Sequence, residues 1–294
     1  MKLTLWKRGY HKCYQLKVGG KNMGKTTKKT LNDLDGKTWF SLSFSIWRDI
    51  RKTPEEMKLN HPAIFPIALT TRIIKIFTKK GATVLDPFMG CGSTIISAAL
   101  ENRKGIGIDL SEEYYEVTKN RIRNLGFKLL EPDFIKPQIY HDDARNLLKY
   151  VMPNSVDLCV TSPPYWNILR EPRTADRKKN ISYSNSEKDL GNIDNYDKFL
   201  EELEKIFEKV YQVLTPDGYC VVVVMDIRKQ NKFYPFHSDL VQKMKEIGFS
   251  FEDIIIWDRQ YEYSNMKPIG YPYAFRVNKV HEYILIFKKV TKNG

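Results

Sequence analysis

Short apolar runs and longer amphipathic stretches alternate along most of the chain. Residues 156–160 and 219–225 are almost continuously apolar, which is typical of parallel strands that are buried on both faces. In residues 196–214 the apolar positions recur every three to four residues, which predicts an amphipathic helix. This alternation predicts an α/β fold in which a mostly parallel, Rossmann-like sheet carries helices on both faces.

Two late apolar runs depart from the alternation. Residues 251–257 and 280–287 each predict a strand, and no helical pattern separates them. Strands that are joined without a crossover helix pair in the antiparallel direction. The sequence therefore predicts one antiparallel edge strand in the otherwise parallel sheet. Residues 39–52 are also rich in apolar and aromatic side chains, and we expect them in the core, with a cover of a ligand pocket as the alternative.

A first motif follows the predicted strand at 83–86. The chain continues as Asp86-Pro87-Phe88-Met89-Gly90-Cys91-Gly92-Ser93-Thr94 into an apolar helical pattern. Glycines permit a tight turn and the close approach of a ligand, and a helix N-terminus offers free N–H groups. The next predicted strand ends at Asp109, and an acid in that place suits a ribose diol. The third glycine of the dinucleotide fingerprint is missing at the required offset, so the motif is not that fingerprint.

A second motif follows the predicted strand at 156–160. Its sequence is Thr161-Ser162-Pro163-Pro164-Tyr165-Trp166. Two prolines end a strand and hold the backbone in a stiff, extended turn. Such a turn can present a hydroxyl and a carbonyl oxygen beside an aromatic ring, although an ordinary Pro-Pro loop is the alternative. Ligands of open α/β sheets bind at the carboxyl ends of strands, so both motifs are expected at one crevice.

Together the two motifs resemble those of the amino-methyltransferases that act on the exocyclic nitrogens of DNA bases. Residues 86–94 are similar to the methyl-donor motif of that family. Residues 161–166 are similar to its catalytic motif, in the Ser-Pro-Pro-Tyr form that is usual in cytosine-N4 enzymes. Adenine-N6 enzymes more often carry Asp or Asn in place of Ser162, so adenine-N6 methylation remains an alternative. The resemblance extends from about residue 61 to 289 and implies a seven-stranded class I methyltransferase fold, S-adenosylmethionine as cofactor and no metal.

The resemblance also implies roles for individual residues. The expected catalytic residues are Ser162, Pro163, Pro164 and Tyr165, with Tyr165 stacked on the target base. The expected donor site comprises His61, Pro62, Phe65, Asp86, Pro87, Phe88, Gly90, Gly92, Thr94, Asp109, Leu110, Asp142, Asp143 and Ala144. Of the two neighbouring acids, Asp143 is the better candidate to hold the donor's adenine, and either can instead cap the following helix. A structural place at a helix entry explains His61 more simply than catalysis.

Basic and aromatic segments flank the motifs. Residues 1–50 are expected to form a basic aromatic arm and residues 51–294 the catalytic domain. Polar, basic segments at 167–195 and 259–279 are expected to be substrate loops. The alternative is a disordered surface loop for the first segment and a cover of the sheet edge for the second. The candidate substrate contacts are Trp166, Arg170, Arg173, Lys178 and Tyr183.

The composition indicates a polyanionic partner. The 294 residues carry a formal net charge of +13, which suits nucleic acid. Duplex DNA is the favoured substrate, and its target base must be flipped out of the stack. The chain shows no insertion large enough for a target-recognition domain, so structured RNA is an alternative substrate. Whether a companion restriction endonuclease exists is left open. A basic binding protein on a degenerate fold is the non-enzymatic alternative, and the intact motifs argue against it.

The cysteines and the apolar runs indicate the cellular compartment. The four cysteines have no metal-ligand spacing and indicate a reducing environment. No apolar run reaches the ~18 residues of a membrane span, and the start of the chain lacks the apolar core of a signal peptide. A cytoplasmic protein without a membrane partner is therefore expected.

Overall fold

The computed structural model of the protein describes residues 30–59, 64–126, 132, 134–168, 188–263 and 268–290. Leu31–Gly294 form one compact unit. Most of the expected basic arm, residues 1–29, lies outside the described residues.

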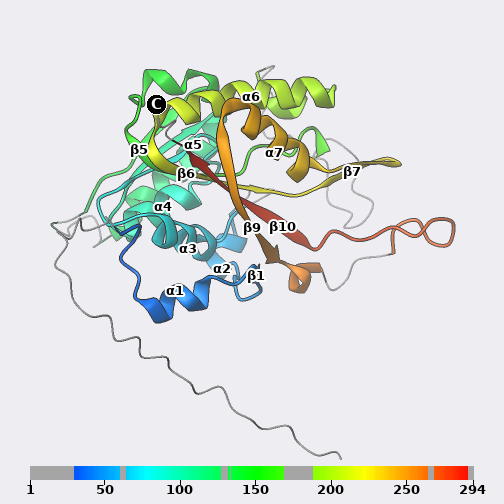
Figure 1. Ribbon diagram of the computed structural model, residues 1–294, viewed down its shortest axis with the longest axis horizontal. Coiled ribbons are helices and arrows are strands. Elements are labelled where there is room, and N and C mark those ends of the chain that lie inside the picture. The colour runs from blue at the N-terminus through cyan, green and yellow to red at the C-terminus, as the bar shows by residue number, and fades with distance from the viewer. Residues whose placement is uncertain are drawn as a thin grey trace, which may run out of the picture. The chain divides into compact units, whose positions relative to one another are not determined.

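Strands of the described residues form one large sheet and one small hairpin (Figure 1). The large sheet has eight strands in the order β1-β9-β10-β6-β5-β2-β3-β4, and β7 pairs with β8. Their bounds are β1 Ile46–Trp47, β2 Thr83–Asp86, β3 Lys104–Asp109, β4 Gln138–His141, β5 Val156–Thr161, β6 Leu214–Val224, β7 Ile227–Lys229, β8 Lys232–Tyr234, β9 Phe249–Asp258 and β10 His281–Lys289.

The strand order reverses between β2 and β5. The chain runs outward from β2 through β3 to β4, and then returns to β5 on the other side of β2. β2 and β5 pair in parallel, with Val84 opposite Leu158 and Leu85 opposite Cys159. Their carboxyl ends therefore meet at one edge of the sheet, at the switch point where open α/β sheets bind ligands.

Two predictions about the sheet are corrected. The sheet has eight strands instead of seven, because Ile46 and Trp47 add a short strand that pairs in parallel with Ile256 and Trp257. The antiparallel strand β10 is not at the edge, since it pairs with β9 on one side and β6 on the other. The nearly continuous apolar run of β10 explains this place, because its residues from Ile284 to Phe287 are all buried. β9 carries exposed acids and lies farther out.

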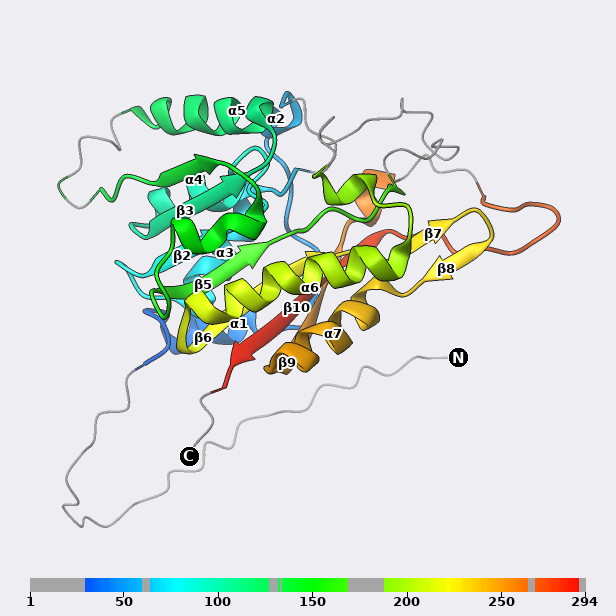
Figure 2. The same cartoon turned by 90° about the horizontal axis from the view of Figure 1, so that it is seen from above.

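Helices cover both faces of the sheet (Figure 2). The α-helices are α1 Gly36–Leu42, α2 Pro54–Met57, α3 Ile67–Phe77, α4 Ser93–Leu100, α5 Glu112–Arg123, α6 Tyr196–Val213 and α7 Phe236–Ile247. The part of the chain that the structure describes also contains the short 3-10 helices η2 Ala144–Lys149, η4 Leu190–Asn192 and η5 Gln260–Tyr263. The predicted amphipathic helix at 196–214 is thus confirmed as α6.

Alternate residues of the central strands feed two separate cores. On β6, Val222 and Val224 pack in the core beneath α6 and α7, whereas Val221 and Val223 pack in the core beneath α3. This two-sided burial explains the continuous apolar runs, because a strand covered on both faces has no solvent-facing side. Residues 215–218 bulge out of β6, since Leu214 pairs with Val156 and Tyr219 pairs with Leu158.

The aromatic segment before α3 is less buried than expected. Trp47 and Ile50 lie in the core, but Trp39, Phe40 and Phe44 are exposed. The prediction of a core segment is therefore correct for Trp47 and Ile50 and wrong for the exposed side chains, which are Trp39, Phe40, Phe44 and Ile46. Among the described residues, no helix has the length and apolarity to cross a membrane.

Candidate active site

The turn between β2 and α4 is shaped by two glycines. Gly90 and Gly92 have φ angles of 50° and 77°, in the left-handed region that glycine adopts without strain. A Cβ at Gly92 would clash with Cγ2 of Thr118. The Thr118 hydroxyl donates to the carbonyl of Gly90 at 2.9 Å. Glycine is therefore required at Gly92 both by its φ angle and by the close approach of α5.

Asp109 ends β3 directly beside this turn. Its carboxylate accepts hydrogen bonds from the backbone N–H of Gly90 at 2.7 Å and of Ser111 at 2.9 Å. Burial raises the pKa of Asp109 to about 6, although both hydrogen bonds oppose the rise. Each oxygen retains lone-pair capacity beyond its one backbone donor, so Asp109 can accept further hydroxyl donors.

Asp86 ties the two motifs together. Its Oδ1 accepts from the hydroxyl of Thr161 at 2.7 Å and from the backbone N–H of Phe88 at 3.1 Å. Burial raises the pKa of Asp86 to about 6, and these hydrogen bonds counteract part of that effect. Because Asp86 ends β2 and Thr161 ends β5, this bond fixes the glycine turn against the Ser-Pro-Pro-Tyr turn.

The two acids after β4 have different surroundings. Asp143 is buried, lines the cavity and accepts hydrogen bonds from the backbone and the guanidinium of Arg145, both at 2.8 Å. Asp142 does not line the cavity. It accepts from the hydroxyl of Tyr150 at 2.7 Å and from the amide of Asn146 at 2.8 Å, and these bonds lower its pKa. The geometry thus favours Asp143 as the ligand-facing acid, while its Oδ1 also caps η2.

The Ser-Pro-Pro-Tyr turn presents part of its motif to the cavity. Ser162 and Pro164 line it, whereas Pro163 is buried and does not. The Ser162 hydroxyl donates to the Tyr165 oxygen at 3.1 Å. The Tyr165 ring is 7% exposed and packs edge-on against Phe236. Stacking of Tyr165 on a base stays a prediction.

Trp166 lies next to the cavity without lining it. Its indole N–H donates to the carbonyl of Ile193 at 2.7 Å, and its ring is buried. The ammonium of Lys229 lies 4.5 Å from the centre of this ring, and it donates to Asn167 at 3.1 Å. These contacts place the β7–β8 hairpin beside the Ser-Pro-Pro-Tyr turn.

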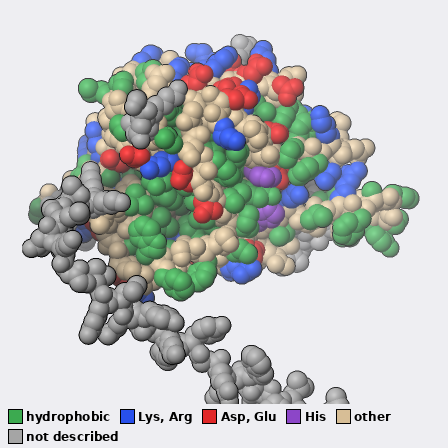
Figure 3. All heavy atoms as spheres, viewed as in Figure 1, with side chains coloured by type: hydrophobic (Ala, Val, Ile, Leu, Met, Phe, Trp, Pro, Cys, Tyr) green, Lys and Arg blue, Asp and Glu red, His purple; other side chains and the backbone are tan. Residues whose placement is uncertain are grey.

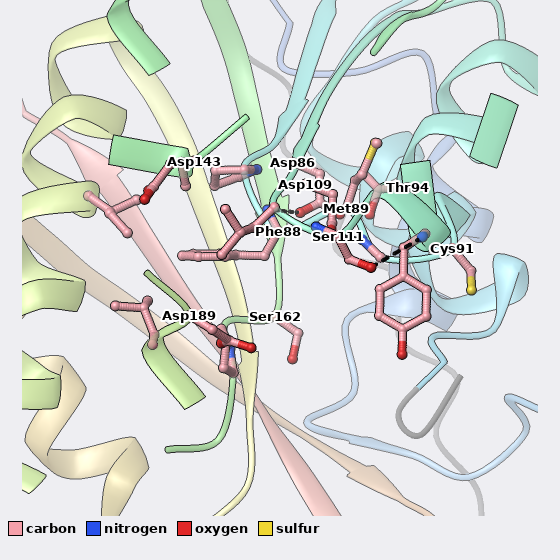
Figure 4. A pocket seen from close by; sticks show the side chains of 18 of the residues that line it. Asp86, Phe88, Met89, Cys91, Thr94, Asp109, Ser111, Asp143, Ser162 and Asp189 are labelled. Atoms are coloured by element: carbon pink, nitrogen blue, oxygen red, sulfur yellow. Dashed lines mark hydrogen bonds between the residues drawn. The ribbon is translucent and has the colours of Figure 1, made fainter. Parts of the chain in front are cut away.

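One cavity collects most of the predicted donor site (Figure 4). It holds about 940 Å³ of space, counted out to its open mouth. Its walls are Ile64, Phe65, Asp86, Pro87, Phe88, Met89, Gly90, Cys91, Ser93, Thr94, Asp109, Leu110, Ser111, Tyr114, Asp143, Ala144, Ser162, Pro164, Lys188, Asp189, Leu190 and Ile206. Figure 4 shows Ser162 and Asp189 on one side of Phe88 and Asp86, Asp109 and Asp143 on the other. Gly92 is predicted in the site but does not line the cavity, and it shapes the turn whose other residues do.

Several predicted residues lie outside the described residues. They are His61, Pro62, Arg170, Arg173, Lys178 and Tyr183. The 167–195 substrate loop is described at its two ends alone.

Sequence reasoning missed one wall of the cavity. Lys188, Asp189 and Leu190 lie at the start of η4, within the segment expected to be a loop. Asp189 is buried, and it accepts a hydrogen bond from the backbone N–H of Gly191 at 2.8 Å. An acid two residues before a glycine is a weak local turn signal, and long-range packing alone brings it to the site. Within the described chain, no group of His, Cys, Asp and Glu could hold a metal ion.

Most of the chain is similar to known proteins. A model of the N6/N4 methyltransferase family, described as DNA methylase, matches residues 7–120 and 156–293. Both motif-bearing turns lie within these ranges.

Individual relatives match over shorter stretches. The chain is 40% identical over 89 residues to the orphan methyltransferase M.BamHII of Bacillus amyloliquefaciens, which covers 29% of this chain and 34% of the relative. It is 30% identical over 176 residues to the Type II methyltransferase M.MjaI of Methanocaldococcus jannaschii, which covers 52% of this chain and 55% of the relative. The chain thus spans about a third and about half of their lengths.

Among solved structures, the chain is similar in fold to TrmN from Thermus thermophilus. The TM-score is 0.50 and the sequence identity is 14%, over 78% of this chain and 50% of that chain. At this identity the likeness concerns the fold alone.

Proposed function

The chain belongs to the DNA methylase family of N6 and N4 amino-methyltransferases, and we propose that it methylates the exocyclic N4 of a cytosine flipped out of DNA. The methyl donor is S-adenosylmethionine, as in this family. The observation that carries the proposal is that Ser162 lines the same cavity as Asp109 and Asp143. The serine in place of Asp or Asn favours cytosine-N4 as the target atom.

The groups around the cavity fit such a donor. The free oxygen lone pairs of Asp109 suit a ribose diol, and the carboxylate of Asp143 suits the amino group of an adenine. The first N–H groups of α4 suit a carboxylate at the methionine end. Phe88 and Ile206 add apolar walls for a planar ring. When bound, S-adenosylmethionine supplies an electrophilic sulfonium methyl group.

The catalytic turn supplies hydrogen-bond acceptors. A cytosine amino nitrogen is a poor nucleophile because its lone pair is delocalised into the ring. Ser162 Oγ can accept one amino hydrogen, which favours a more tetrahedral nitrogen with its lone pair directed at the methyl group. Acceptance of the second amino hydrogen by the Pro163 carbonyl stays a prediction, because Pro163 does not line the cavity. Positioning and fixed dipoles then lower the barrier without a covalent enzyme intermediate.

A basic aromatic surface beside the catalytic turn is the proposed DNA contact. The β7–β8 hairpin is tied to the turn through Lys229, and Arg276 donates to Asn231 of that hairpin at 2.6 Å. We call residues 268–277, which Arg276 anchors, the aromatic loop. Neither 227–236 nor 268–280 contains an acid. Cations with exposed aromatic rings suit nucleic-acid backbones and bases. A companion restriction endonuclease is not part of this proposal.

The catalytic assignment is tested with Ser162→Ala. We expect this variant to bind S-adenosylmethionine with wild-type affinity in calorimetry and to lose most methyl transfer to DNA, because it removes one acceptor for the amino group. The matched control is Ser155→Ala at the other end of β5, where the serine is exposed. Wild-type transfer by Ser162→Ala would contradict the assignment.

A further inference from the structure

A buried acid lies behind the catalytic turn. Glu282 on β10 is 4% exposed. One of its oxygens accepts from the guanidinium of Arg259, and the other accepts from the Tyr165 hydroxyl at 3.1 Å. Tyr165 in turn accepts from Ser162 at 3.1 Å. A continuous hydrogen-bond chain therefore joins a buried ion pair to the serine that lines the cavity.

We propose that Glu282 is a positioning residue that fixes the direction of this chain and so keeps the lone pairs of Ser162 available to the target amino group. The inference rests on the proposed function, because it requires Ser162 to accept an amino hydrogen. Glu282 itself does not line the cavity, so it acts through Tyr165.

The direction follows from the protons that each group carries. An ionised carboxylate can only accept hydrogen bonds, so Tyr165 donates its single hydroxyl proton to Glu282. The phenol oxygen is then an acceptor, and the Ser162 hydroxyl donates to it. With its own proton used in this way, Ser162 directs lone pairs toward the cavity. The opposite polarity would point the Ser162 proton at the amino hydrogens.

Arg259 and Glu282 form a buried ion pair that holds the Glu282 carboxylate in place. Burial alone lowers the pKa of Arg259, but the carboxylates of Glu282 and Glu262 raise it overall. Lys52 adds a further cation 3.5 Å from Glu262. A buried ion pair often stabilises a fold no better than apolar residues of similar volume. Stability alone therefore does not explain an acid at this place in an apolar strand.

The test compares two variants that each break the hydrogen-bond chain from Glu282 through Tyr165 to Ser162. Glu282→Gln lets an amide N–H donate to Tyr165 and so removes the fixed polarity, while Tyr165→Phe removes the acceptor of the Ser162 proton. We expect each variant to lower the single-turnover rate of methyl transfer to DNA roughly 10- to 100-fold. The dissociation constant for S-adenosylmethionine should stay within about twofold of wild type. The double variant should be no slower than the slower single variant.

The matched control is Tyr283→Phe. Tyr283 is the next residue on β10, and its hydroxyl donates to the buried carboxylate of Asp226 at 3.3 Å. This control should keep the wild-type rate. If Glu282→Gln fails to fold in a thermal unfolding assay, Tyr165→Phe decides, because it leaves the ion pair intact.

Two results would overturn the inference while the proposed function stands. One is a wild-type rate of methyl transfer in folded Glu282→Gln or in Tyr165→Phe. The other is a fully additive loss of rate in the double variant. If wild-type protein binds S-adenosylmethionine but transfers nothing to DNA, the proposed function fails and the inference falls with it.

Discussion

At the scale of single residues, the site contains several carboxylates, and the neighbours of each carboxylate determine its role. Asp109 and Asp143 line the cavity, while Asp142 is held away from it by Tyr150 and Asn146. Asp86 is buried and holds Thr161. Four acids with the same chemistry thus have different tasks, because each has different hydrogen-bond donors and a different degree of burial.

The raised pKa of Asp109 predicts a pH dependence of donor binding. A ribose hydroxyl that donates to Asp109 favours its ionised form, so the bound protein has a lower pKa there than the free protein, where burial raises the pKa to about 6. Affinity for S-adenosylmethionine should therefore fall as the pH decreases through about 6. Calorimetry between pH 5 and 8 measures this.

The matching variant is Asp109→Asn. It should bind the donor roughly 10- to 100-fold more weakly at pH 8, because a hydrogen bond to a charged group is lost. Most of the pH dependence should also disappear. An unchanged pH profile in Asp109→Asn would assign the titration to another group, such as Asp86.

The neighbouring acids after β4 provide a paired test. Asp143→Asn should weaken donor binding about tenfold, because it removes a charged acceptor from the cavity wall. Asp142→Asn is the control and should leave donor binding unchanged, since its side chain is bonded to Tyr150 and Asn146. Equal effects of the two substitutions on the dissociation constant would refute the assignment of Asp143.

At the scale of elements, the site is built where strands end. The β2–α4 turn, the end of β3 and the turn after β5 all reach one cavity. Parallel strands bring their carboxyl ends to the same edge, so short motifs that are 75 residues apart, such as Asp86 and Thr161, can be in direct contact. The glycine turn and the aromatic loop can each be tested by substitution.

Gly92→Ala should destabilise the glycine turn. The new Cβ would meet Thr118 and would sit at a φ of 77°, so we expect a loss of about 1–3 kcal/mol in the free energy of unfolding. Chemical denaturation measures this loss. Adding Thr118→Ala should recover part of it. The control is Gly36→Ala, where a Cβ would meet nothing within 4 Å.

The aromatic loop should contribute to DNA affinity. Tyr273 and Phe275 are 95% and 97% exposed, and Figure 3 shows hydrophobic side chains on the projecting lobe at the right. Replacing both by Ala should weaken DNA binding by about 1–3 kcal/mol per stacked base, without changing donor affinity. Phe40→Ala on α1, also an exposed aromatic, is the control in the same fluorescence anisotropy assay. Unchanged DNA affinity would exclude a role of the loop in binding.

At the scale of the whole molecule, periodicity predicted much of the fold. The alternation of buried strands and amphipathic helices gave the parallel sheet, because burial on both faces leaves a continuous apolar signal in the chain. The place of β10 could not be predicted, since apolarity does not encode which neighbour a buried strand chooses. The two-residue strand β1 is too short to leave a periodic pattern.

The site could be predicted where its residues lie close together in the sequence. Asp86, Gly90, Asp109 and Ser162 lie in contiguous motifs, and the structure brings all four to one cavity. Asp189 has only a weak local turn signal and Glu282 has none, because long-range packing brings each to its place. Substrate-loop residues such as Arg170 lie outside the described residues and stay predictions.

The most direct test of the proposed function is nucleoside mass spectrometry. Purified protein and isotope-labelled S-adenosylmethionine are incubated in parallel with mixed-sequence duplex DNA and with unmodified ribosomal RNA, with Ser162→Ala as the negative control. We expect label in N4-methyldeoxycytidine from the DNA. Label in N6-methyldeoxyadenosine, or label from the RNA alone, would contradict the proposed target.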